Sequence, residues 1–373
     1  MILRTSEWVS PGHPDKVADG ISEYILDKLL AIDPDTRYAL EVQIKGSQVS
    51  LAGEITTKAD VVEGDYQHWA KEAVNAIGYT FQYQSKWGEE NTICGDDLMV
   101  FCNIQQQSPE IACGVNNDGW GDQGIFTGYA ELGNDNYMPM DKDLAREIGM
   151  KLYKNAKENG IGGLDIKTQV TLNKDKMEQL IVAIPVRDDF ELEEIKSMIT
   201  FWLEVEKGIN YLPDDHIIVN GTGIYKQHGP IADCGTTGRK LAVDFYGNNA
   251  PIGGGSPWTK DGTKADLSLN LFARENAVKD LIRYTETDSE YDGADIHHVI
   301  CQLCCCIGKS RIYETIKLYN KEGYLIDVKS TDYVVKPSEV IERYHLKEPI
   351  YFDLCENGLF ESDKIWNGIS YDV

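Results

Sequence analysis

The sequence predicts an α+β fold built from three units with the same order of elements. Three amphipathic segments of helical periodicity begin near residues 15, 141 and 266, at nearly equal intervals. Each is followed by two short stretches of alternating apolar and polar residues, which is typical of a β-hairpin. A further amphipathic helix closes each unit. Helices on one face of each sheet follow from this order, so we expect three similar helix–hairpin–helix domains.

The first helix of each unit is indicated by its apolar spacing. Residues 15–30, 141–159 and 266–285 place apolar side chains three or four positions apart, as one buried helix face requires. Gly160 directly follows the second segment, where a glycine commonly ends a helix. These three segments are therefore predicted as the helices that open the units.

The hairpins and closing helices are predicted from alternation and from turn residues. The strand pairs are expected at 40–44 with 49–51, at 166–172 with 179–186, and at 297–307 with 311–319. The closing helices are expected near 60–77, 190–206 and 337–345.

The connection between the first two units differs from the others. Residues 105–124 are rich in Gly, Asn and Asp and are too long for an ordinary connection, so they are predicted to form a mobile lid or binding loop. The expected organisation is an N-terminal domain, a flexible loop at the active site, a central domain and a C-terminal domain. Their boundaries are 1–107, 108–124, 125–225 and 226–373.

Composition excludes several classes of protein. The 373 residues include 61 Asp and Glu against 36 Lys and Arg, a net charge of −25. This charge argues against general binding of nucleic acid and against docking on anionic lipid. No apolar run is long enough to span a membrane, and the N-terminal residues lack the apolar core of a secretory signal. The nine cysteines are too few and too clustered for a disulfide scaffold. They fit a reducing compartment, so a cytoplasmic location is expected.

Three short motifs resemble known sites but lack the required context. Residues 119–124 fit G-x-G-x-x-G, yet a polar run precedes them where a dinucleotide site needs a strand. Residues 308–310 resemble the end of a P-loop, but Leu303 stands where that pattern requires glycine. Residues 301–306 (CQLCCC) supply one half of a zinc motif without its second half. We interpret this last run as a core strand, because cysteine behaves as a small buried hydrophobe.

The sequence GHPDK at 12–16 carries chemistry at the start of the first helix. Pro14 suits the first turn of a helix, whose free N–H groups attract phosphate. Asp15 would repel phosphate unless it held Mg²⁺, which binds carboxylate and phosphate oxygens together. His13 could donate a proton or a hydrogen bond to a leaving oxygen. The alternative for Asp15 is a favourable charge in the first helical turn.

Two glycine-rich stretches concentrate positive charge in this acidic chain. They are 233–240 (DCGTTGRK) and 253–266 (GGGSPWTKDGTKAD). A polyphosphate clamp would combine their cations with a lysine from the second hairpin, and the residues concerned are Lys167, Arg239, Lys240, Lys260 and Lys264. Asp266 is a candidate for a second Mg²⁺ ligand. On sequence alone, cations on solvent-exposed loops remain an equal alternative.

These motifs, taken together, carry a family resemblance. In order along the chain they are GHPDK at 12–16, AGEITT at 52–57, QQQSPE at 105–110, GDQG at 121–124 and DCGTTGRK at 233–240. The set resembles the S-adenosylmethionine synthetase family, also called methionine adenosyltransferases. The resemblance carries specific motifs from about residue 4 to residue 270. From 310 to 373 it rests on element order alone.

The resemblance implies a fold and a reaction. The family arranges three similar α+β domains around a pseudo-threefold axis. It makes S-adenosylmethionine from ATP and L-methionine, by attack of the methionine sulfur on C5′ of ATP with loss of triphosphate, which is then hydrolysed to pyrophosphate and phosphate. Two Mg²⁺ ions and one K⁺ are implied as cofactors. A homodimer or homotetramer with active sites at the dimer interface is implied as the assembly, without nucleic acid or membrane as partners.

The resemblance also assigns roles to individual residues. It implies catalytic roles for His13, Lys167, Arg239, Lys240 and Lys264. It implies ATP contacts for His13, Asp165, Lys167, Tyr225, Asp233, Arg239, Lys240, Ser256 and Lys260. It implies methionine contacts for Glu54, Gln107, Asp122, Asp233 and Lys264. It implies Asp15 and Asp266 as Mg²⁺ ligands and Glu41 as the K⁺ ligand.

The chain departs from the family pattern around these residues. The family loop GGGAFSGKD reads GGGSPWTKD here, with new residues from Ser256 to Thr259, and Ile224 replaces an expected arginine. A divergent, active synthetase is the function we expect. Two alternatives are an Mg²⁺-dependent triphosphate hydrolase and a non-catalytic regulatory homologue. Retention of the charged set disfavours the regulatory alternative, since such a subunit has no need of a polyphosphate site.

Overall fold

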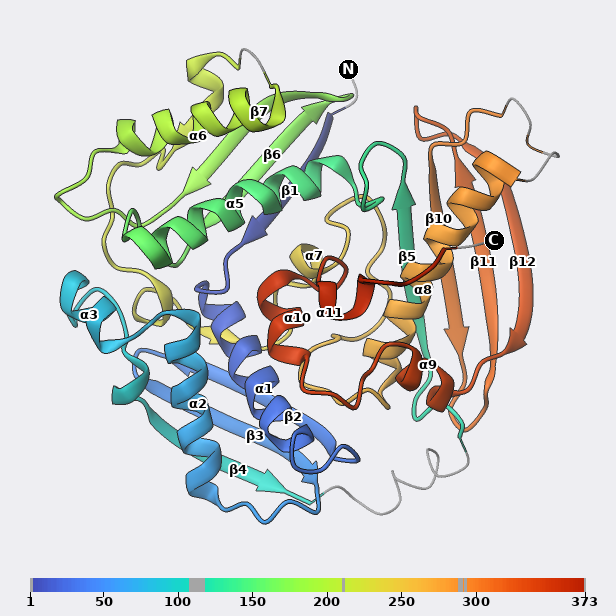
Figure 1. The fold of residues 1–373 in the computed structure, drawn as a ribbon, viewed down its shortest axis with the longest axis horizontal. Helices are drawn as coiled ribbons and strands as arrows, with labels where there is room; N and C mark the ends of the chain where they lie inside the picture. The colour runs from blue at the N-terminus through green and yellow to red at the C-terminus, as the bar shows by residue number, and fades with distance from the viewer. Residues whose placement is uncertain (1–2, 107–117, 210–211, 288–290, 292–293, 372–373) are drawn as a thin grey trace.

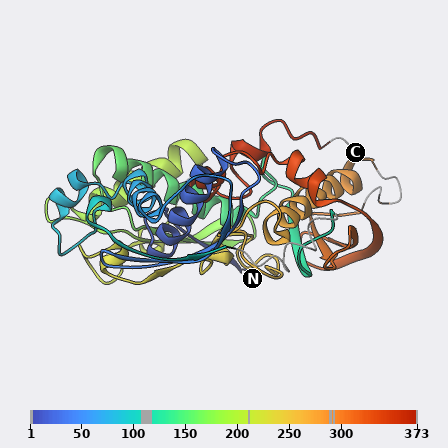
Figure 2. The same ribbon diagram turned by 90° about the horizontal axis from the view of Figure 1, so that it is seen from below.

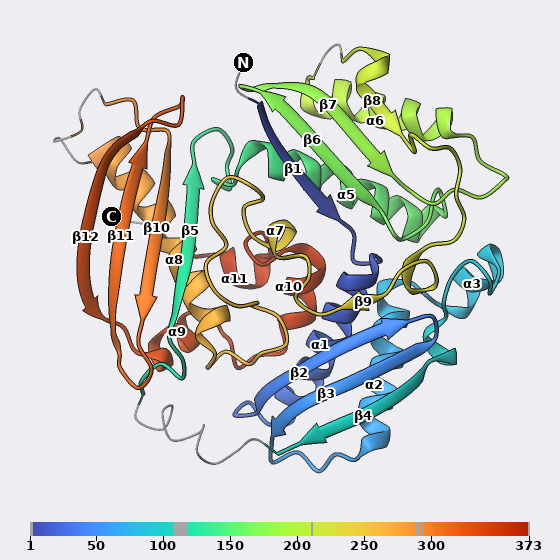
Figure 3. The same ribbon diagram turned by 180° about the vertical axis from the view of Figure 1, so that it is seen from behind.

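Three four-stranded sheets surround the middle of the molecule. The structure, a computed structural model, describes residues 3–106, 118–209, 212–287, 291 and 294–371. Figure 1 views the molecule from the side of the helices, and Figure 3 shows the three sheets from behind with the helices beyond them. Seen edge-on, the molecule is flattened (Figure 2). The predicted α+β fold with three similar units is confirmed.

The N-terminal sheet has the strand order β4-β3-β2-β9. Its strands are β2 (Arg37–Lys45), β3 (Gln48–Thr56), β4 (Met99–Gln105) and β9 (Gly235–Thr236). The segments on its helical side are α1 (Pro14–Leu30), α2 (Glu63–Ile77), α3 (Phe81–Trp87) and the 3₁₀ turn Gly95–Asp97. Leu40, Val42 and Ile44 are buried toward these helices while Glu41 and Gln43 point outward. The predicted first helix, hairpin and closing helix are confirmed.

The central sheet has the order β1-β6-β7-β8. Its strands are β1 (Leu3–Val9), β6 (Lys167–Asn173), β7 (Lys176–Ala183) and β8 (Ile217–Val219). Its helices are α5 (Met140–Asn159) and α6 (Leu192–Lys207), with short 3₁₀ turns at Asp214–His216 and Gly229–Ile231. Gly160 ends α5 in the left-handed conformation, with φ of 72°, as its position predicts.

The C-terminal sheet has the order β12-β11-β10-β5. Its strands are β5 (Gly124–Glu131), β10 (His298–Cys305), β11 (Arg311–Tyr319) and β12 (Leu325–Val334). The nearby helices are α7 (Leu241–Asp244), α8 (Ala265–Ile282), α9 (Pro337–Arg343), α10 (Tyr351–Asn357) and α11 (Asp363–Trp366). The helix predicted over 266–285 ends as α-helix at Ile282 and continues as a π turn over Arg283–Thr287.

One strand of each sheet comes from a distant part of the chain. β1 pairs antiparallel with β6 in the central sheet, β5 pairs antiparallel with β10, and β9 pairs with β2. Each unit thus contributes one strand to the sheet of another unit. This exchange of strands is not predictable from the sequence, because local alternation indicates a strand but not its partner. The domain boundaries predicted from the sequence remain a prediction, since the sheets draw strands from across them.

Close packing explains why a glycine interrupts α5. A Cβ on Gly149 would lie 2.2 Å from the indole ring of Trp8, so only glycine lets β1 seat its tryptophan against this helix. Trp8 is buried in consequence. This contact fastens the exchanged strand to the central unit.

Several motifs from the sequence have a clear place in the fold. Residues 308–310 lie in the turn between β10 and β11, so no helix follows them as a P-loop requires. Cys301 and Cys305 are buried in β10, which confirms the core-strand interpretation for part of that run. Cys304 on the same strand and Cys306 just after it are exposed, because alternate residues of a strand face opposite sides of the sheet. Residues 107–117, most of the predicted lid, lie outside the described part of the chain. Within the described part, no helix combines the length and apolar character needed to cross a membrane.

Candidate active site

His13 stands at the N-terminus of α1 and is almost fully buried, with 3% of its surface exposed. Its Nδ1 accepts a hydrogen bond of 3.1 Å from the backbone N–H of Asp15, so it caps the helix. Burial, reinforced by the cations of Lys240 and Lys167, lowers the pKa of His13 to about 3. The ring is therefore neutral at pH 7. Because Nδ1 accepts, Nε2 carries the proton and is a hydrogen-bond donor.

Asp15 gathers the positive side chains of the 233–240 loop. Lys240 Nζ lies 2.6 Å from Asp15 Oδ2, and Arg239 approaches Oδ1 at 3.8 Å. The backbone N–H of Thr236 donates to Oδ1 at 2.9 Å. Burial acts to raise the pKa of Asp15, but the hydrogen bonds from Lys240 and Thr236 outweigh it and hold the pKa below its usual value. Asp15 is thus a carboxylate that holds two cations at a helix N-terminus.

Asp165, just before β6, also lies near Lys240 and Lys167. Its Oδ2 accepts a 2.9 Å hydrogen bond from the backbone of Gly229, while its Oδ1 is buried without a hydrogen-bond partner. Burial raises the pKa of Asp165 to about 6, with Lys167 acting in the opposite direction. The charge of Asp233 acts to raise the pKa of Asp165, and burial together with the charge of Asp165 raises the pKa of Tyr225, so these side chains lie near one another. A buried oxygen without a partner is an acceptor available to a ligand.

A second group forms at the start of α8. Lys260 Nζ lies 2.5 Å from Asp266 Oδ2 and 3.1 Å from the backbone oxygen of Ser256. Asp266 is in the first turn of α8, and Lys264 is the residue that precedes the helix. A Cβ on Gly255 would lie 2.4 Å from the Asp266 carboxyl, which explains the glycine there.

Asp122 joins this second group through β10. The thiol of Cys305 donates to the backbone oxygen of Asp122 at 3.3 Å. Burial raises the pKa of Cys305 to about 12, and the charges of Asp122 and Asp266 contribute to that shift. The acidic position of the GDQG motif is therefore near the Mg²⁺ ligand predicted from α8.

Glu41 links the two groups. One carboxylate oxygen accepts a hydrogen bond from the hydroxyl of Thr237, in the 233–240 loop. The other lies 3.2 Å from the hydroxyl of Thr259, in the glycine-rich loop. Thr259 is β-branched and buried, yet its φ is 72°, a conformation that costs of order 1–3 kcal/mol.

Of the two remaining residues predicted to contact methionine, Glu54 and Gln107, the structure describes only Glu54. Glu54 is exposed on β3, in register with Ala39 of β2. Ala39 also forms a backbone bridge with Lys260, so Glu54 lies one strand away from the second group. Gln107 falls outside the described residues.

A buried network behind His13 was missed by sequence reasoning. Lys16 Nζ contacts Asp244 at 2.8 Å and Asp19 at 3.1 Å. Trp258 donates its indole N–H to Asp244 at 2.7 Å, and Lys16 Nζ lies 4.4 Å from the centre of the Trp258 ring. Lys16 belongs to the GHPDK motif, which was the available signal. Trp258, read from the sequence as a departure, is here a partner of that motif.

Replacing Trp258 with phenylalanine should test this network. The change removes a hydrogen bond to a buried carboxylate, so we expect the free energy of unfolding to fall by about 1.5–3 kcal/mol. Urea denaturation followed by circular dichroism measures the loss. Trp69→Phe is the control, because half-buried Trp69 packs edge-on against Tyr66. Equal losses in the two variants would contradict a role for the Trp258 N–H.

A group of three buried residues lies under the C-terminal sheet. The thiol of Cys301 donates to Glu314 Oε1 at 3.1 Å, and Asp280 approaches so that the three potential ligand atoms lie within 4.8 Å of one another. Burial raises the pKa of Asp280 to about 8 and raises that of Cys301 well above its usual value. Protons on these groups let them pack together, which agrees with the interpretation of the cysteine run as core.

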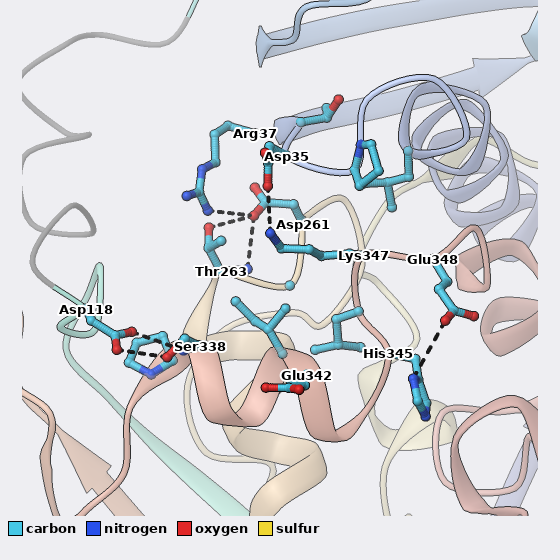
Figure 4. Close-up of a pocket in the computed structure, with 17 residues that line it drawn as sticks. Asp35, Arg37, Asp118, Asp261, Thr263, Ser338, Glu342, His345, Lys347 and Glu348 are labelled. Atoms are coloured by element: carbon cyan, nitrogen blue, oxygen red, sulfur yellow. Dashed lines mark hydrogen bonds and ion pairs between the residues drawn. The ribbon is translucent and has the colours of Figure 1, made fainter.

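A cavity of about 530 Å³ lies beside the second group rather than in it. Figure 4 shows its wall, where Lys347 reaches Asp35 at 2.6 Å and Arg37 approaches Asp261 at 3.6 Å. None of the residues assigned to ATP, methionine or metal lines it. Cavity size therefore does not locate the candidate site, which lies on loops at the open face of the sheets.

Comparisons with known proteins identify the family of this chain. Models of the N-terminal, central and C-terminal domains of S-adenosylmethionine synthetase match residues 1–109, 117–225 and 227–368. S-adenosylmethionine synthases from Phocaeicola vulgatus and Pseudothermotoga lettingae are each 34% identical, over 95% and 98% of this chain and 89% and 96% of their own lengths.

A solved structure gives the same result for the fold. The structure described as an unusual S-adenosylmethionine synthetase from Campylobacter jejuni superposes with a TM-score of 0.82 at 28% identity, over 98% of this chain and 96% of that one. With all three domain models and close relatives matched, the chain belongs to the S-adenosylmethionine synthetase family of methionine adenosyltransferases.

Proposed function

We propose that the protein makes S-adenosyl-L-methionine from ATP and L-methionine, with attack of the sulfur on C5′ of ATP and loss of triphosphate, which is then hydrolysed to pyrophosphate and phosphate. The observation that carries the proposal is the convergence of His13, Asp15 and Lys240 at one helix N-terminus, in a member of this family. A thioether is a weak neutral nucleophile. The rate must therefore come from alignment and from stabilising the departing polyanion.

The residues around the N-terminus of α1 would bind the triphosphate. Arg239, Lys240 and Lys167 supply positive charge around the N-terminus of α1, whose free N–H groups also favour phosphate. Neutral His13 would donate its Nε2–H to the oxygen that leaves C5′. Lys260 and Lys264, at the start of α8, would bind the phosphates farthest from the adenosine.

Asp165 and Tyr225 would bind the adenosine of ATP. The unpartnered buried Oδ1 of Asp165 can accept a hydrogen bond from a hydroxyl or amino group of the nucleoside. The Tyr225 ring can cover a face of adenine. Ser256, whose backbone contacts Lys260, lies at the loop proposed to contact ATP.

Carboxylates would bind methionine and the sulfonium product. Asp122 and Asp233 are proposed to lie near the ammonium group of methionine and the positive sulfur of the product, and Glu54 and Gln107 complete the proposed contacts. Opposite charge favours a cation close by, so these residues suit a reaction that forms one.

Asp15 and Asp266 fit the two Mg²⁺ ions that the family implies. Mg²⁺ prefers carboxylate oxygens and retains places for water and phosphate oxygens. Both carboxylates now hold a lysine, Lys240 and Lys260, so each already attracts a positive partner. When bound, Mg²⁺ would offset the negative charge of the phosphates. Glu41 is the proposed K⁺ ligand.

A homodimer or homotetramer with active sites at a subunit interface is part of the proposal. Met99 and Phe101 on β4 are 52% and 58% exposed on the face of the N-terminal sheet that carries Glu41. A second copy that covered this face would bury both apolar side chains and enclose the site. A cytoplasmic location is also proposed, because the described cysteines are free thiols.

One assay separates this function from its alternatives. The protein is given ATP, L-methionine, Mg²⁺ and K⁺, and the sulfonium product and phosphate are measured separately. We expect both products in equal amounts. Phosphate without sulfonium would point to a triphosphate hydrolase, and neither product would point to a regulatory homologue.

Replacing Lys264 with alanine should weaken both chemical steps. Lys264 precedes α8 beside Lys260 and Asp266, and both steps handle triphosphate. We expect sulfonium formation and hydrolysis of added triphosphate each to fall at least tenfold, about 1.4 kcal/mol of barrier. Lys154→Ala, at an exposed position of α5, is the control and should change neither rate. Normal hydrolysis of triphosphate by the Lys264 variant would contradict the role.

A further inference from the structure

Four acidic residues follow one another at intervals of four along α1. They are Asp15, Asp19, Glu23 and Asp27, and this spacing places them on one side of the helix. The helix packs against both the N-terminal sheet and α10 (Figure 1). Each of the four accepts a hydrogen bond from the backbone of a segment packed against that side. One side of α1 therefore fastens several separate segments of the chain.

The third acidic residue, Glu23, makes its hydrogen bond next to a cation of the candidate site. It accepts from the backbone N–H of Thr259 at 2.6 Å, and Lys260 is the next residue in the chain. Asp27, one turn further along α1, instead accepts from the first backbone N–H groups of α10, at 2.8 and 2.9 Å. Glu23 and Asp27 thus form a matched pair, because both bind backbone from α1 but only Glu23 does so beside the site.

The backbone N–H of Thr259 depends on Glu23. Thr259 is 1% exposed, so almost none of its surface meets water. Its carbonyl oxygen accepts from the N–H of Leu40 in β2 at 3.1 Å, which ties the other side of the residue to the sheet. A buried N–H without an acceptor is unfavourable. The backbone at Thr259 would therefore have to move if Glu23 could not accept its hydrogen bond.

The conformation of Thr259 adds a reason for that movement. Its φ of 72° is unfavourable for a β-branched residue and persists only while the surroundings hold it. Loss of the Glu23 bond would let the residue relax toward negative φ. Lys260 would then be displaced from its present place, where its Nζ lies 2.5 Å from Asp266 Oδ2.

We propose that Glu23 is a positioning residue for Lys260: by accepting the Thr259 N–H, it sets where the Lys260 ammonium lies relative to the phosphates of ATP. The inference rests on the proposed function, in which Lys260 binds those phosphates. Glu23 has no exposed surface, so it acts through Lys260 rather than by touching a substrate.

Two variants of Glu23 separate the hydrogen bond from the rest of the side chain. Burial raises the pKa of the Glu23 carboxyl well above its usual value, with the Thr259 hydrogen bond acting in the opposite direction. The neutral amide of Glu23→Gln keeps the acceptor, whereas Glu23→Met keeps the length and removes it. We expect the Kd for ATP with Mg²⁺, measured by calorimetry without methionine, to rise at least fivefold in Glu23→Met. In Glu23→Gln it should stay within twofold of the wild type.

Kinetics should show the same pattern. Lys260 would bind the phosphates both before and during the reaction, so the loss in Glu23→Met should appear in the KM for ATP more than in kcat. A structural role alone is tested by Asp27→Leu, which removes the acceptor for α10. This variant should lower the melting temperature while leaving the Kd for ATP within twofold of the wild type.

A double-mutant cycle tests whether Glu23 acts through Lys260. Lys260→Ala should weaken ATP binding, and adding Glu23→Met to it should change the Kd by less than twofold, since the lysine to be positioned is gone. Glu23→Asp serves if the methionine variant does not fold, because it keeps a buried acid but withdraws it by one methylene. Its Kd for ATP should rise at least threefold.

The outcomes distinguish this inference from the proposed function. An unchanged Kd in Glu23→Met or Glu23→Asp, equal weakening in Asp27→Leu, or additive effects in the cycle would overturn the positioning role even if the protein makes the sulfonium. The expected pattern of ATP binding, in a protein that makes no sulfonium, would support the positioning role and reject the function.

Discussion

Replacing His13 with alanine is expected to slow sulfonium formation by about 10²–10⁴-fold while changing ATP affinity by less than about threefold. In the proposed mechanism the neutral ring would donate its Nε2–H to the leaving oxygen, an interaction that would strengthen only as negative charge develops there. Single-turnover formation of S-adenosylmethionine gives the rate, and equilibrium binding gives the ATP affinity. Unchanged single-turnover kinetics would remove His13 from the chemistry.

The control for this variant separates catalysis from helix capping. His13→Asn supplies a side-chain oxygen that can still accept from the Asp15 N–H, so it keeps the cap. Its side chain is too short to present a donor where Nε2 now lies. We expect it to restore the stability that alanine loses, but not the rate.

The lowered pKa of His13 also predicts a pH dependence. The pKa of His13 is about 3 in the folded chain, against about 6.5 for an unperturbed histidine, so the unfolded state binds more protons between these limits. The stabilisation is complete above pH 6.5 and is lost as pH falls toward 3. Urea denaturation at several pH values should show a steeper decline for the wild type than for His13→Asn in that window. The plot of activity against pH should show no change near pH 6.5 that is due to protonation of His13.

Replacing Lys240 with methionine is expected to reduce sulfonium formation by about 10²–10³-fold, the usual effect of removing one group that stabilises developing negative charge. Methionine keeps much of the length of the side chain and removes its charge. Steady-state kinetics should show the loss mainly in kcat. Triphosphate should also bind more weakly.

The Lys240 variant is compared with an exposed lysine to which no role in the site is assigned. Lys58 is 80% exposed and lies 3.7 Å from Asp35, so Lys58→Met should leave both constants within about twofold of the wild type. A loss of less than fivefold for Lys240→Met would show that the Asp15–Lys240 contact is only structural.

The predictable part of the fold is the part that local patterns encode. The helix of residues 15–30 and the hairpin of 40–51 follow from apolar spacing and a glycine turn, and the structure confirms both. The partners of β1 and β5 could not be predicted, because strand pairing depends on packing between units rather than on neighbouring residues. The contact of Trp8 with Gly149 illustrates such packing.

The candidate site likewise has a part that sequence motifs indicate and a part that they do not. The motifs indicated His13, Asp15 and the loop lysines, since charge and glycine content are visible in sequence. They could not show that Lys240 closes on Asp15 across 225 positions. Nor could they show that Trp258 bonds to Asp244, or that Thr259 has a positive φ. Those facts depend on how loops meet in space.

The exchanged strands bear on the order of folding. Leu3 pairs with Asn173, and Gly124 pairs with Cys305, so the earliest strand to be synthesised must wait for nearly half of the chain. Pairings this distant in sequence fold slowly, because the loop must close before any contact stabilises it. A nascent chain would expose unpaired strand edges for that interval. The same strands mean that no unit has a complete sheet of its own, so fragments cut at the predicted domain boundaries should not fold until they are mixed.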